Sequence, residues 1–434
     1  MSAPALSPRR RRDIIDALRR GTVPRQGLDL LSVGLTRFEG AIDGELASVA
    51  SGGAGFKAVR GEYGSGKTFF SRWLTERAKK ADFATAEIQI SETETPLHKL
   101  ETVYRRIVEN LSTPTTPSGA LRDVVDGWFY LLDSDAAEGS TEGVLELLDK
   151  RLAVVSKEAP AFAAVLRQYR LVEAAGDTAQ AEGLLAWLGG QPHVSASVKR
   201  AAGVRGDLDH FGALGFLQGL LTVLRDSEYA GLVIVLDEVE TLQRMRSDVR
   251  EKSLNALRQL LDEIDGGRYP GLYVLMTGTP AFYDGTQGMQ RLPPLAQRVA
   301  TDFQTDLRWD NPRAPQIRLP GFTTDSLVEL GARVRDIYAA GASSPDRIRE
   351  TVDDAYIRTL ALAVGGSLGG KVGVAPRLFL KKLIADVLDR VDLYDDFDPR
   401  RDYRLTVTSS ELTDVEREAH AAPATSVDDI TLDG

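Results

Sequence analysis

The 434-residue chain contains no cysteine and only four histidines. The lack of cysteine excludes disulfide bonds and thiolate metal sites, and it agrees with a cytoplasmic location, where disulfides are rare. With so few histidines, we expect no histidine-based metal site. No run of about 18 apolar residues occurs, so the sequence predicts no membrane-spanning helix. An arginine run at 9–12 is followed by no apolar stretch, so we expect no secretory signal.

Basic residues are fewer than acidic ones: the chain has 53 Lys and Arg and 63 Asp and Glu, which gives a net charge of −10. A protein that used its whole surface to bind nucleic acid would be basic. Any contact with DNA must therefore come from a local patch, from a channel formed on assembly, or from a partner. The arginines at 9–12 are either such a patch or part of a solvated tail.

One short stretch carries most of the functional information, because it fits the pattern G-x-x-x-x-G-K-[ST] of a phosphate-binding loop, or P-loop. The stretch comprises Gly61, Glu62, Tyr63, Gly64, Ser65, Gly66, Lys67 and Thr68, and Phe69 follows it. The glycines allow backbone N–H groups to surround phosphate oxygens, and Lys67 supplies a positive charge. Thr68 is expected to hold Mg²⁺. The predicted ligands are therefore ATP and Mg²⁺.

The flanks of this loop agree with the motif. Residues 56–60 suit a short strand, and residues 68–80 suit an amphipathic helix whose positive N-terminal end would face the phosphates. The alternative interpretation is a glycine-rich surface turn that happens to precede an amphipathic helix.

A second group of candidate residues follows the strongest strand signal, the aliphatic run at 232–236. Asp237 and Glu238 come directly after it, at the end of the strand where ligands bind in parallel sheets. Asp237 is expected to help hold Mg²⁺, and Glu238 to polarise the attacking water. A lone Asp at this place would be read as a helix cap. Another strand is predicted at 272–276, with a helix near 253–264 between the two strands, giving a right-handed β-α-β unit.

Further candidates lie downstream. Thr277 or Thr279, after the strand at 272–276, is expected to sense the γ-phosphate, and the sequence leaves the choice between them open. Arg298 is expected to complete the site of a neighbouring subunit, and Arg377 to couple the γ-phosphate to a helical lid. The alternative for each arginine is a surface or salt-bridging role.

The chain as a whole predicts an α/β protein with a parallel sheet. We expect a disordered basic N-terminus at 1–12 and a P-loop ATPase domain at 13–320, with a helical insertion at about 96–229. A helical lid is expected at 321–395, and an acidic, largely disordered tail at 396–434.

The order of P-loop, acidic strand, threonine strand, arginine and lid arginine resembles the AAA+ superfamily. Four blocks resemble the ATP-binding P-loop proteins of BREX phage-defence systems. They are Ala17–Pro24, Gly61–Phe70, Gly271–Pro280 and Pro376–Leu380. The resemblance implies an ATPase related to origin-recognition and Cdc-six-like AAA+ proteins, working in a DNA-linked defence system beside a helicase. One departure is that too few residues follow Asp395 for the winged helix of those relatives, which puts direct duplex binding in doubt.

These observations together lead us to expect an oligomeric AAA+ ATPase in anti-phage defence. It would hydrolyse ATP to ADP and phosphate and so remodel or license a DNA-acting partner, such as a helicase, through its helical insertion. One alternative is a nucleotide-gated switch or scaffold whose ATP-bound assembly is the signal. Others are an origin- or transposition-type DNA loader and, less favoured, a small-molecule kinase.

Overall fold

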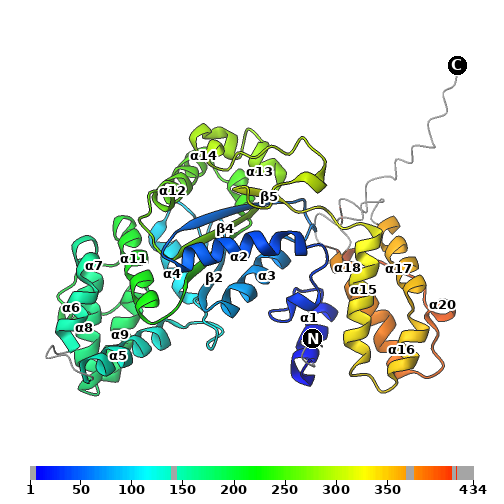
Figure 1. The fold of residues 1–434 in the computed structure, drawn as a ribbon, viewed down its shortest axis with the longest axis horizontal. Helices are drawn as coiled ribbons and strands as arrows, with labels where there is room; N and C mark the ends of the chain where they lie inside the picture. The colour runs from blue at the N-terminus through cyan, green and yellow to red at the C-terminus, as the bar shows by residue number, and fades with distance from the viewer. Residues whose placement is uncertain (1–5, 138–143, 368–375, 413–416, 418–434) are drawn as a thin grey trace. The chain divides into compact units, whose positions relative to one another are not determined.

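The computed structural model describes residues 6–137, 144–367, 376–412 and 417. The chain divides into two compact units. Figure 1 shows the fold with the chain coloured by residue number. Unit 1 consists of Met1–Glu39, Gly61–Glu76 and Arg318–Gly434, and unit 2 of Gly40–Arg60 and Arg77–Ile317.

Unit 2 is built around a sheet with the strand order β2-β3-β4-β1-β5. The strands are β1 (Gly55–Arg60), β2 (Phe83–Gln89), β3 (Gly231–Asp237), β4 (Leu272–Gly278) and β5 (Gln316–Arg318). The pairs β2·β3, β3·β4 and β4·β1 are parallel. Residues 232–236 of the central strand β3 are all buried, as expected for a parallel strand that is covered on both faces.

The crossover from β3 to β4 runs through helix α12 (Ser247–Asp265). Because β3 and β4 are adjacent and parallel, the β-α-β unit that the sequence predicts is present. Shorter elements follow β3 and β4. They are η2 (Val239–Arg244), α13 (Pro280–Asp284), η3 (Met289–Arg291), α14 (Pro293–Arg298) and η4 (Leu307–Trp309). The edge strand β5 was not predicted, because three residues carry too little alternation to be recognised as a strand.

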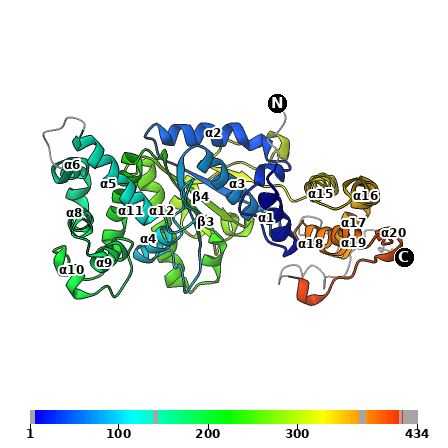
Figure 2. The same ribbon diagram turned by 90° about the horizontal axis from the view of Figure 1, so that it is seen from below.

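Helices fill the chain between β2 and β3. They are α4 (Leu100–Glu109), α5 (Leu121–Ala137), α6 (Val144–Arg151), α7 (Ala153–Glu158), α8 (Pro160–Ala174), α9 (Thr178–Leu188), α10 (Ala196–Ala201) and α11 (His210–Asp226). In Figures 1 and 2, α5–α10 gather on the far side of α4 and α11 from the sheet. One continuous hydrophobic cluster includes side chains of both the sheet and these helices, so the insertion is part of the core of unit 2.

Unit 1 has its own hydrophobic cluster, formed by helix α1 and the helices of the lid. Its elements are α1 (Pro8–Arg19), η1 (Leu28–Leu30), α15 (Thr324–Ala339), α16 (Pro345–Thr351), α17 (Asp354–Ser367), α18 (Pro376–Lys381), the π-helical η6 (Lys382–Leu388), α19 (Asp389–Leu393), α20 (Pro399–Asp402) and η7 (Ser409–Glu411). Two helices carry residues of both units, α2 (Thr36–Ala50) and α3 (Lys67–Lys80).

The structure differs from the expectations at both ends of the chain. The arginines at 9–12 lie inside α1, which starts at Pro8, because Ser7 caps the helix by accepting a hydrogen bond from the N–H of Arg10. Near the other end, Leu405 and Leu412 pack on the core of unit 1, so the prediction of a largely disordered segment from position 396 is wrong for residues 396–412. Residues 1–5, 413–416 and 418–434 lie outside the described residues.

Candidate active site

The predicted P-loop lies between β1 and α3, in unit 1. Gly64 and Gly66 have φ angles of +78° and +93°, a region that side chains other than glycine rarely adopt. A Cβ on Gly61 would lie 2.2 Å from Ser65 Oγ, so any larger residue there would require the Ser65 side chain to move. The N–H groups of Gly64 and Gly66 make no hydrogen bond to a described residue. The buried hydroxyl of Ser65 likewise has no partner there.

Lys67 is the first residue of α3 and is buried within the loop. Its ammonium nitrogen donates to the carbonyl oxygens of Gly61 and Glu62, at 2.9 and 3.3 Å. It also lies 5.0 Å from the centroid of the Tyr63 ring. The positive charge is therefore held against the backbone of the P-loop, and a fixed positive charge beside a glycine-rich loop suits the binding of an anion.

The glycines, the backbone N–H groups and Lys67 of the loop together determine whether it can bind a nucleotide phosphate. A turn that only glycine can form, unpaired N–H groups and a buried lysine together make a suitable anion site. No cluster of three or more His, Asp or Glu side chains that could hold a metal occurs in the described part of the chain. A Mg²⁺ bound with ATP needs only one or two protein oxygens besides those of phosphate and water, so Thr68 and Asp237 are chemically sufficient donors.

The acidic residues lie in unit 2, at the carboxyl edge of the sheet. The parallel register pairs Gln89 of β2 with Asp237 of β3, and the next strand, β4, carries Thr277 near its end. Arg60, the last residue of β1, pairs with Gly278 of β4. Strand β1 therefore ends at the same edge of the sheet as β3 and β4, and the P-loop follows β1 in the sequence.

Glu238 is held in an unusual conformation. Its φ and ψ angles are 58° and 43°, the left-handed region that costs a residue with a side chain about 1–2 kcal/mol. Its N–H donates to Asp237 Oδ1 at 3.1 Å and to Thr277 Oγ1 at 3.4 Å. Gln89 Nε2 donates to Glu238 Oε2 at 2.7 Å. Backbone strain and the Gln89 amide thus fix the direction of the carboxylate.

The two candidate threonines have different surroundings. Thr277 is fully buried, and its hydroxyl donates to Asp237 Oδ1, so it orients the acidic residues. Thr279 lies at the N-cap position of α13, but its hydroxyl makes no capping hydrogen bond. Thr277 therefore contacts the acidic residues, whereas Thr279 lies after the strand end with its side chain buried, at 5% exposure.

Arg298 ends α14 and is ion-paired within its own chain. Its two terminal nitrogens lie 2.6 Å from Asp262 and 2.6 Å from Asp265 of α12. The side chain is 41% exposed, and such exposed pairs contribute little to stability. This is the salt-bridging role that the sequence left as an alternative, and it leaves the guanidinium at the surface of unit 2.

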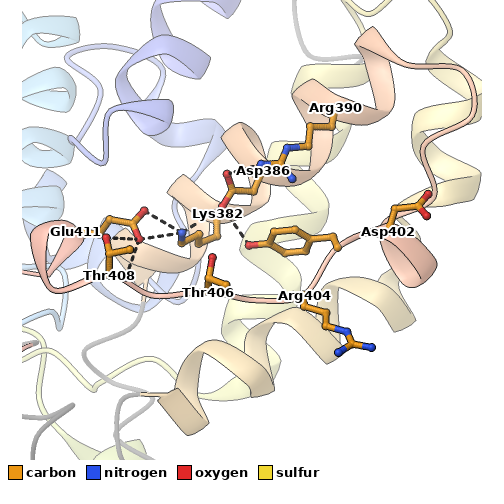
Figure 3. Close-up of a pocket in the computed structure, with 9 residues that line it drawn as sticks. Lys382, Asp386, Arg390, Asp402, Arg404, Thr406, Thr408 and Glu411 are labelled. Atoms are coloured by element: carbon orange, nitrogen blue, oxygen red, sulfur yellow. Dashed lines mark hydrogen bonds and ion pairs between the residues drawn. The ribbon is translucent and has the colours of Figure 1, made fainter.

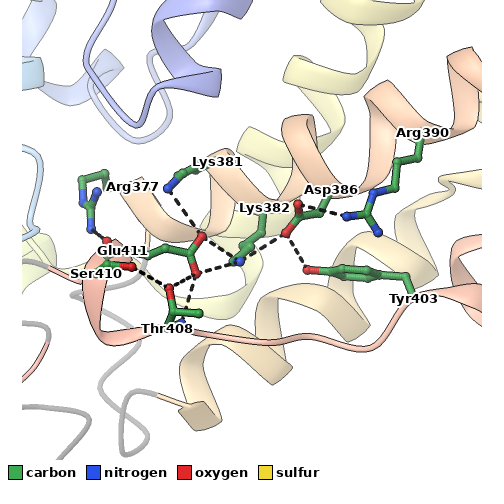
Figure 4. A network of polar contacts seen from close by, with 9 residues as sticks. All are labelled: Arg377, Lys381, Lys382, Asp386, Arg390, Tyr403, Thr408, Ser410 and Glu411. Atoms are coloured by element: carbon green, nitrogen blue, oxygen red, sulfur yellow. Dashed lines mark hydrogen bonds and ion pairs between the residues drawn. The ribbon is translucent and has the colours of Figure 1, made fainter.

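Arg377 lies in the first turn of the lid helix α18, in unit 1. Figure 4 shows its guanidinium directed at the segment that carries Glu411, where Nη2 donates to the Glu411 carbonyl oxygen at 2.6 Å. On its other side, a Cβ on Gly21 would lie 3.3 Å from Arg377 Nη1. The lid arginine is thus placed between the end of α1 and the chain after Tyr403.

That segment, residues 403–412, is attached to the lid by an ion network. Lys382 is buried, and its ammonium lies 2.8 Å from Glu411 and 3.2 Å from Asp386, while the Tyr403 hydroxyl donates to Asp386 at 3.1 Å. Although burial acts to raise it, the Lys382 ammonium and the Thr408 N–H lower the pKa of Glu411 to about 2. A pocket of about 480 Å³ lies between this segment and the helix that carries Lys382, and Figure 3 draws the residues that line it.

Sequence reasoning missed Gln89 and Glu411. The residue type of Gln89 carries no signal, and only the pairing of β2 with β3 places its amide beside Glu238. Glu411 lies three residues after Thr408, and each side chain bonds the other's backbone N–H. That spacing is a capping-box pattern, so a search for it would have found a turn in the predicted tail.

The chain matches a protein family in sequence and has a distant similarity to a solved structure. The chain matches the family described as "BREX system ATP-binding protein BrxC/D" over residues 6–407. No curated protein matches it. Among solved structures it is similar to the ORC2 protein of Aeropyrum pernix, described in ADPNP–ADP complexes. The similarity has a TM-score of 0.34 at 14% identity and covers 80% of this chain and 66% of that one.

The predicted fold class is confirmed. The strand order β2-β3-β4-β1-β5 is the order typical of AAA+ ATPases, and a helical insertion and a helical lid accompany the sheet. Within the described ranges, no helix is both long enough and apolar enough to cross a membrane.

Gln89 generates the first prediction. Replacing Gln89 by Ala removes the hydrogen bond that directs Glu238, so we expect ATP hydrolysis to slow by about tenfold while the Kd for ATP stays unchanged. Steady-state turnover and equilibrium titration with a labelled ATP analogue measure the two quantities. Glu87→Gln, a change two residues earlier on the same face of β2, is the control. An unaltered rate for Gln89→Ala would remove Gln89 from this role.

Glu411 generates the second prediction. Because its pKa is lowered from the ordinary glutamate value of 4.5 to about 2 in the folded chain, its charged form stabilises the fold above pH 4.5. That contribution is lost as the pH falls through about 2. We therefore expect the free energy of unfolding to fall more for the wild-type chain than for Glu411→Gln between these pH values. Denaturant titration of both chains at each pH measures this free energy. The exposed Glu350→Gln should follow wild type, and parallel curves for Glu411→Gln and wild type would contradict the prediction.

Proposed function

Because the chain belongs to the BREX system ATP-binding protein BrxC/D family, we propose that it binds ATP at the P-loop and hydrolyses it to ADP and phosphate. The observation that carries the proposal is the arrangement at the carboxyl edge of the sheet. There Asp237, Glu238 and Thr277 are joined by hydrogen bonds. Thr277 belongs to β4, which lies next to β1, and β1 is the strand that precedes the P-loop in the sequence. Paired acids at this place suit water activation and metal binding.

In the proposed mechanism, the P-loop amides and Lys67 bind the β- and γ-phosphates. Thr68 and Asp237 would hold Mg²⁺, which supplies charge neutralisation at the phosphates when bound. Thr277 keeps Asp237 oriented. Glu238, directed by Gln89, orients a water for in-line attack on the γ-phosphorus and accepts its proton. Thr279 contacts the γ-phosphate, and Phe69 packs behind the loop.

We assign the two arginines to the steps that follow binding. Arg298 lies at the surface of unit 2 in weak ion pairs, so a neighbouring subunit's γ-phosphate can replace its carboxylate partners. Arg377 would contact the γ-phosphate within its own chain and so transmit hydrolysis to the lid. We further propose that the helical insertion carries this change to a protein partner on DNA in phage defence.

A second candidate is a nucleotide-gated switch, in which assembly is the signal and hydrolysis only resets it. The ion pairs of Arg298 with Asp262 and Asp265 favour it, because an arginine already engaged must exchange partners before subunits can join. A Glu238→Gln variant separates the two functions, since it would bind ATP without turning it over. Constitutive defence by that variant supports the switch, and loss of defence supports a hydrolysis-driven activity. Hydrolysis that DNA stimulates with a steep salt dependence would indicate the loader instead.

The central test of the proposal uses Lys67. Lys67→Ala should weaken ATP binding by on the order of 100-fold, because removing one member of a buried charge pair costs several kcal/mol. Isothermal titration calorimetry measures the Kd. Lys80→Ala, at the other end of the same helix, is the matched control. Unchanged ATP affinity in Lys67→Ala would refute the assignment of the P-loop.

The role of Arg298 is tested by mixing subunits. Arg298→Ala should retain ATP binding but hydrolyse ATP at least about tenfold more slowly. Glu238→Gln alone should be inactive, yet its intact Arg298 can complete the site of an Arg298→Ala neighbour. A mixture of the two should therefore regain activity, measured as phosphate release, whereas a mixture of Glu238→Gln with the exposed-surface variant Arg308→Ala gives the reference rate. Absence of any rescue would place the whole site within one chain.

A further inference from the structure

The segment 403–412, which we call the strap, is anchored to the lid at Glu411. Three basic side chains of the continuous helix formed by α18 and η6 converge on this residue (Figure 4). The ammonium nitrogens of Lys381 and Lys382 lie 3.4 and 2.8 Å from Glu411 Oε1. Arg377 Nη2 donates to the Glu411 carbonyl oxygen at 2.6 Å. The lid helix thus directs three positive charges at one residue of the strap.

This anchor is strong because its charges are shielded from water. The Lys382 side chain is 5% exposed and that of Glu411 is 17% exposed. The N–H of Thr408 donates to Glu411 Oε2 at 3.1 Å and so fixes the carboxylate. Breaking a buried ion pair by removing one partner leaves the other charge uncompensated. Lys382 also lies 3.2 Å from Asp386, so loss of the Glu411 charge would still leave it one acidic partner.

The rest of the strap is held less firmly. Tyr403 and Glu411 fix its two ends by polar contacts, and the pocket drawn in Figure 3 lies between the strap and the lid helix. Leu405 and Val407 are only partly buried, whereas Leu412 belongs to the buried core. Release of the strap would therefore break mainly polar contacts, which other hydrogen-bond partners can replace.

The strap limits what the lid arginine can contact. The bond to the Glu411 carbonyl occupies Nη2 of Arg377, and a Cβ on Gly21 would lie 3.3 Å from its Nη1. Arg377 and the P-loop, residues 61–68, belong to the same unit. A hydrogen bond from arginine to phosphate is roughly twice as strong as one between neutral groups. A γ-phosphate can therefore compete with the Glu411 carbonyl for the same guanidinium.

We propose that the strap is an autoinhibitory element, which holds Arg377 on Glu411 until a γ-phosphate draws the arginine away. The proposal rests on the proposed role of Arg377 at the ATP site. Because ADP has no γ-phosphate, only ATP competes with the strap. Coupling between two binding events is reciprocal, so a weaker strap should tighten the binding of ATP and leave that of ADP unchanged.

The first experiment measures the affinity of the full chain for a non-hydrolysable ATP analogue and for ADP by isothermal titration calorimetry. Glu411→Gln keeps the shape of the side chain but removes the charge that Lys381 and Lys382 contact. We expect its Kd for the analogue to fall about fivefold and its Kd for ADP to stay within about twofold of wild type. The exposed Glu350→Gln, also in unit 1, is the matched control and should bind both nucleotides as wild type does.

A double-mutant cycle tests whether Glu411 acts through Arg377. Arg377→Ala has no guanidinium for either the strap or the phosphate, so it should bind the ATP analogue more weakly than wild type. Adding Glu411→Gln to Arg377→Ala should then give no gain in affinity. A gain in the double variant as large as that in Glu411→Gln alone would contradict the proposed coupling.

Hydrogen exchange observes the strap directly in the wild-type chain. The N–H of Glu411 donates to the Thr408 carbonyl oxygen at 2.9 Å, and this turn is formed only while the strap is in place. We expect the amides of residues 403–412 to exchange faster in the complex with the ATP analogue than in the complex with ADP. Equal exchange in the two complexes would overturn the proposal.

The affinities provide the remaining decisive outcomes. Unchanged or weakened binding of the analogue by Glu411→Gln, or an equal change for the analogue and ADP, would mean that the strap only stabilises the lid. If Arg377→Ala bound the analogue as tightly as wild type, the premise that Arg377 contacts the γ-phosphate would be wrong. Failure of the ATP site itself is recognised separately, because Lys67→Ala would then bind ATP like wild type.

Discussion

The parallel register of β2, β3 and β4 is the constraint on which the chemistry of unit 2 depends. It aligns Gln89, Asp237 and Thr277 across three neighbouring strands. The register is well specified, because the middle strand is buried on both faces and a slip by one residue would exchange its two sets of packing side chains. The hydrophobic core therefore decides where the polar groups of the site stand.

The charged groups assigned to ATP all have partners within the chain. Lys67 donates to carbonyl oxygens of its own loop, Arg298 pairs with carboxylates of α12, and Arg377 donates to a carbonyl of the lid segment. Binding a phosphate thus exchanges one set of hydrogen bonds for another. Because exchanges of this kind change the free energy only modestly, selectivity for the nucleotide has to come from geometry.

Much of the fold follows from local sequence. The aliphatic run at 232–236 predicts a buried strand, and Ser7-Pro8 reads afterwards as a helix start, although the arginines beside it suggested a tail. The P-loop and Asp237-Glu238 are legible because glycines and adjacent acids have few other uses in those positions. What the sequence leaves open depends on contacts between distant segments.

Three residues illustrate that limit. Gln89 acquires its partner only through strand register, and Glu411 only through the packing of the strap on the lid helix. The hydroxyl of Thr277 donates to Asp237, and no sequence pattern distinguishes Thr277 from Thr279 in this respect. Local propensity describes neighbours along the chain, whereas each of these roles is set by neighbours in space.

The way in which the helical insertion joins the sheet bears on how the protein can diversify. The insertion leaves from the carboxyl end of β2 and returns to the amino end of β3, and α4 packs on β2 while α11 packs on β3. Helices α5–α10 lie beyond them (Figure 2). Side chains of these outer helices belong to the same hydrophobic cluster as the sheet, so changes in α5–α10 must preserve the packing of α5, α7 and α8 against α11. Diversification of the outer helices is therefore limited by the side chains that they contribute to the core of unit 2.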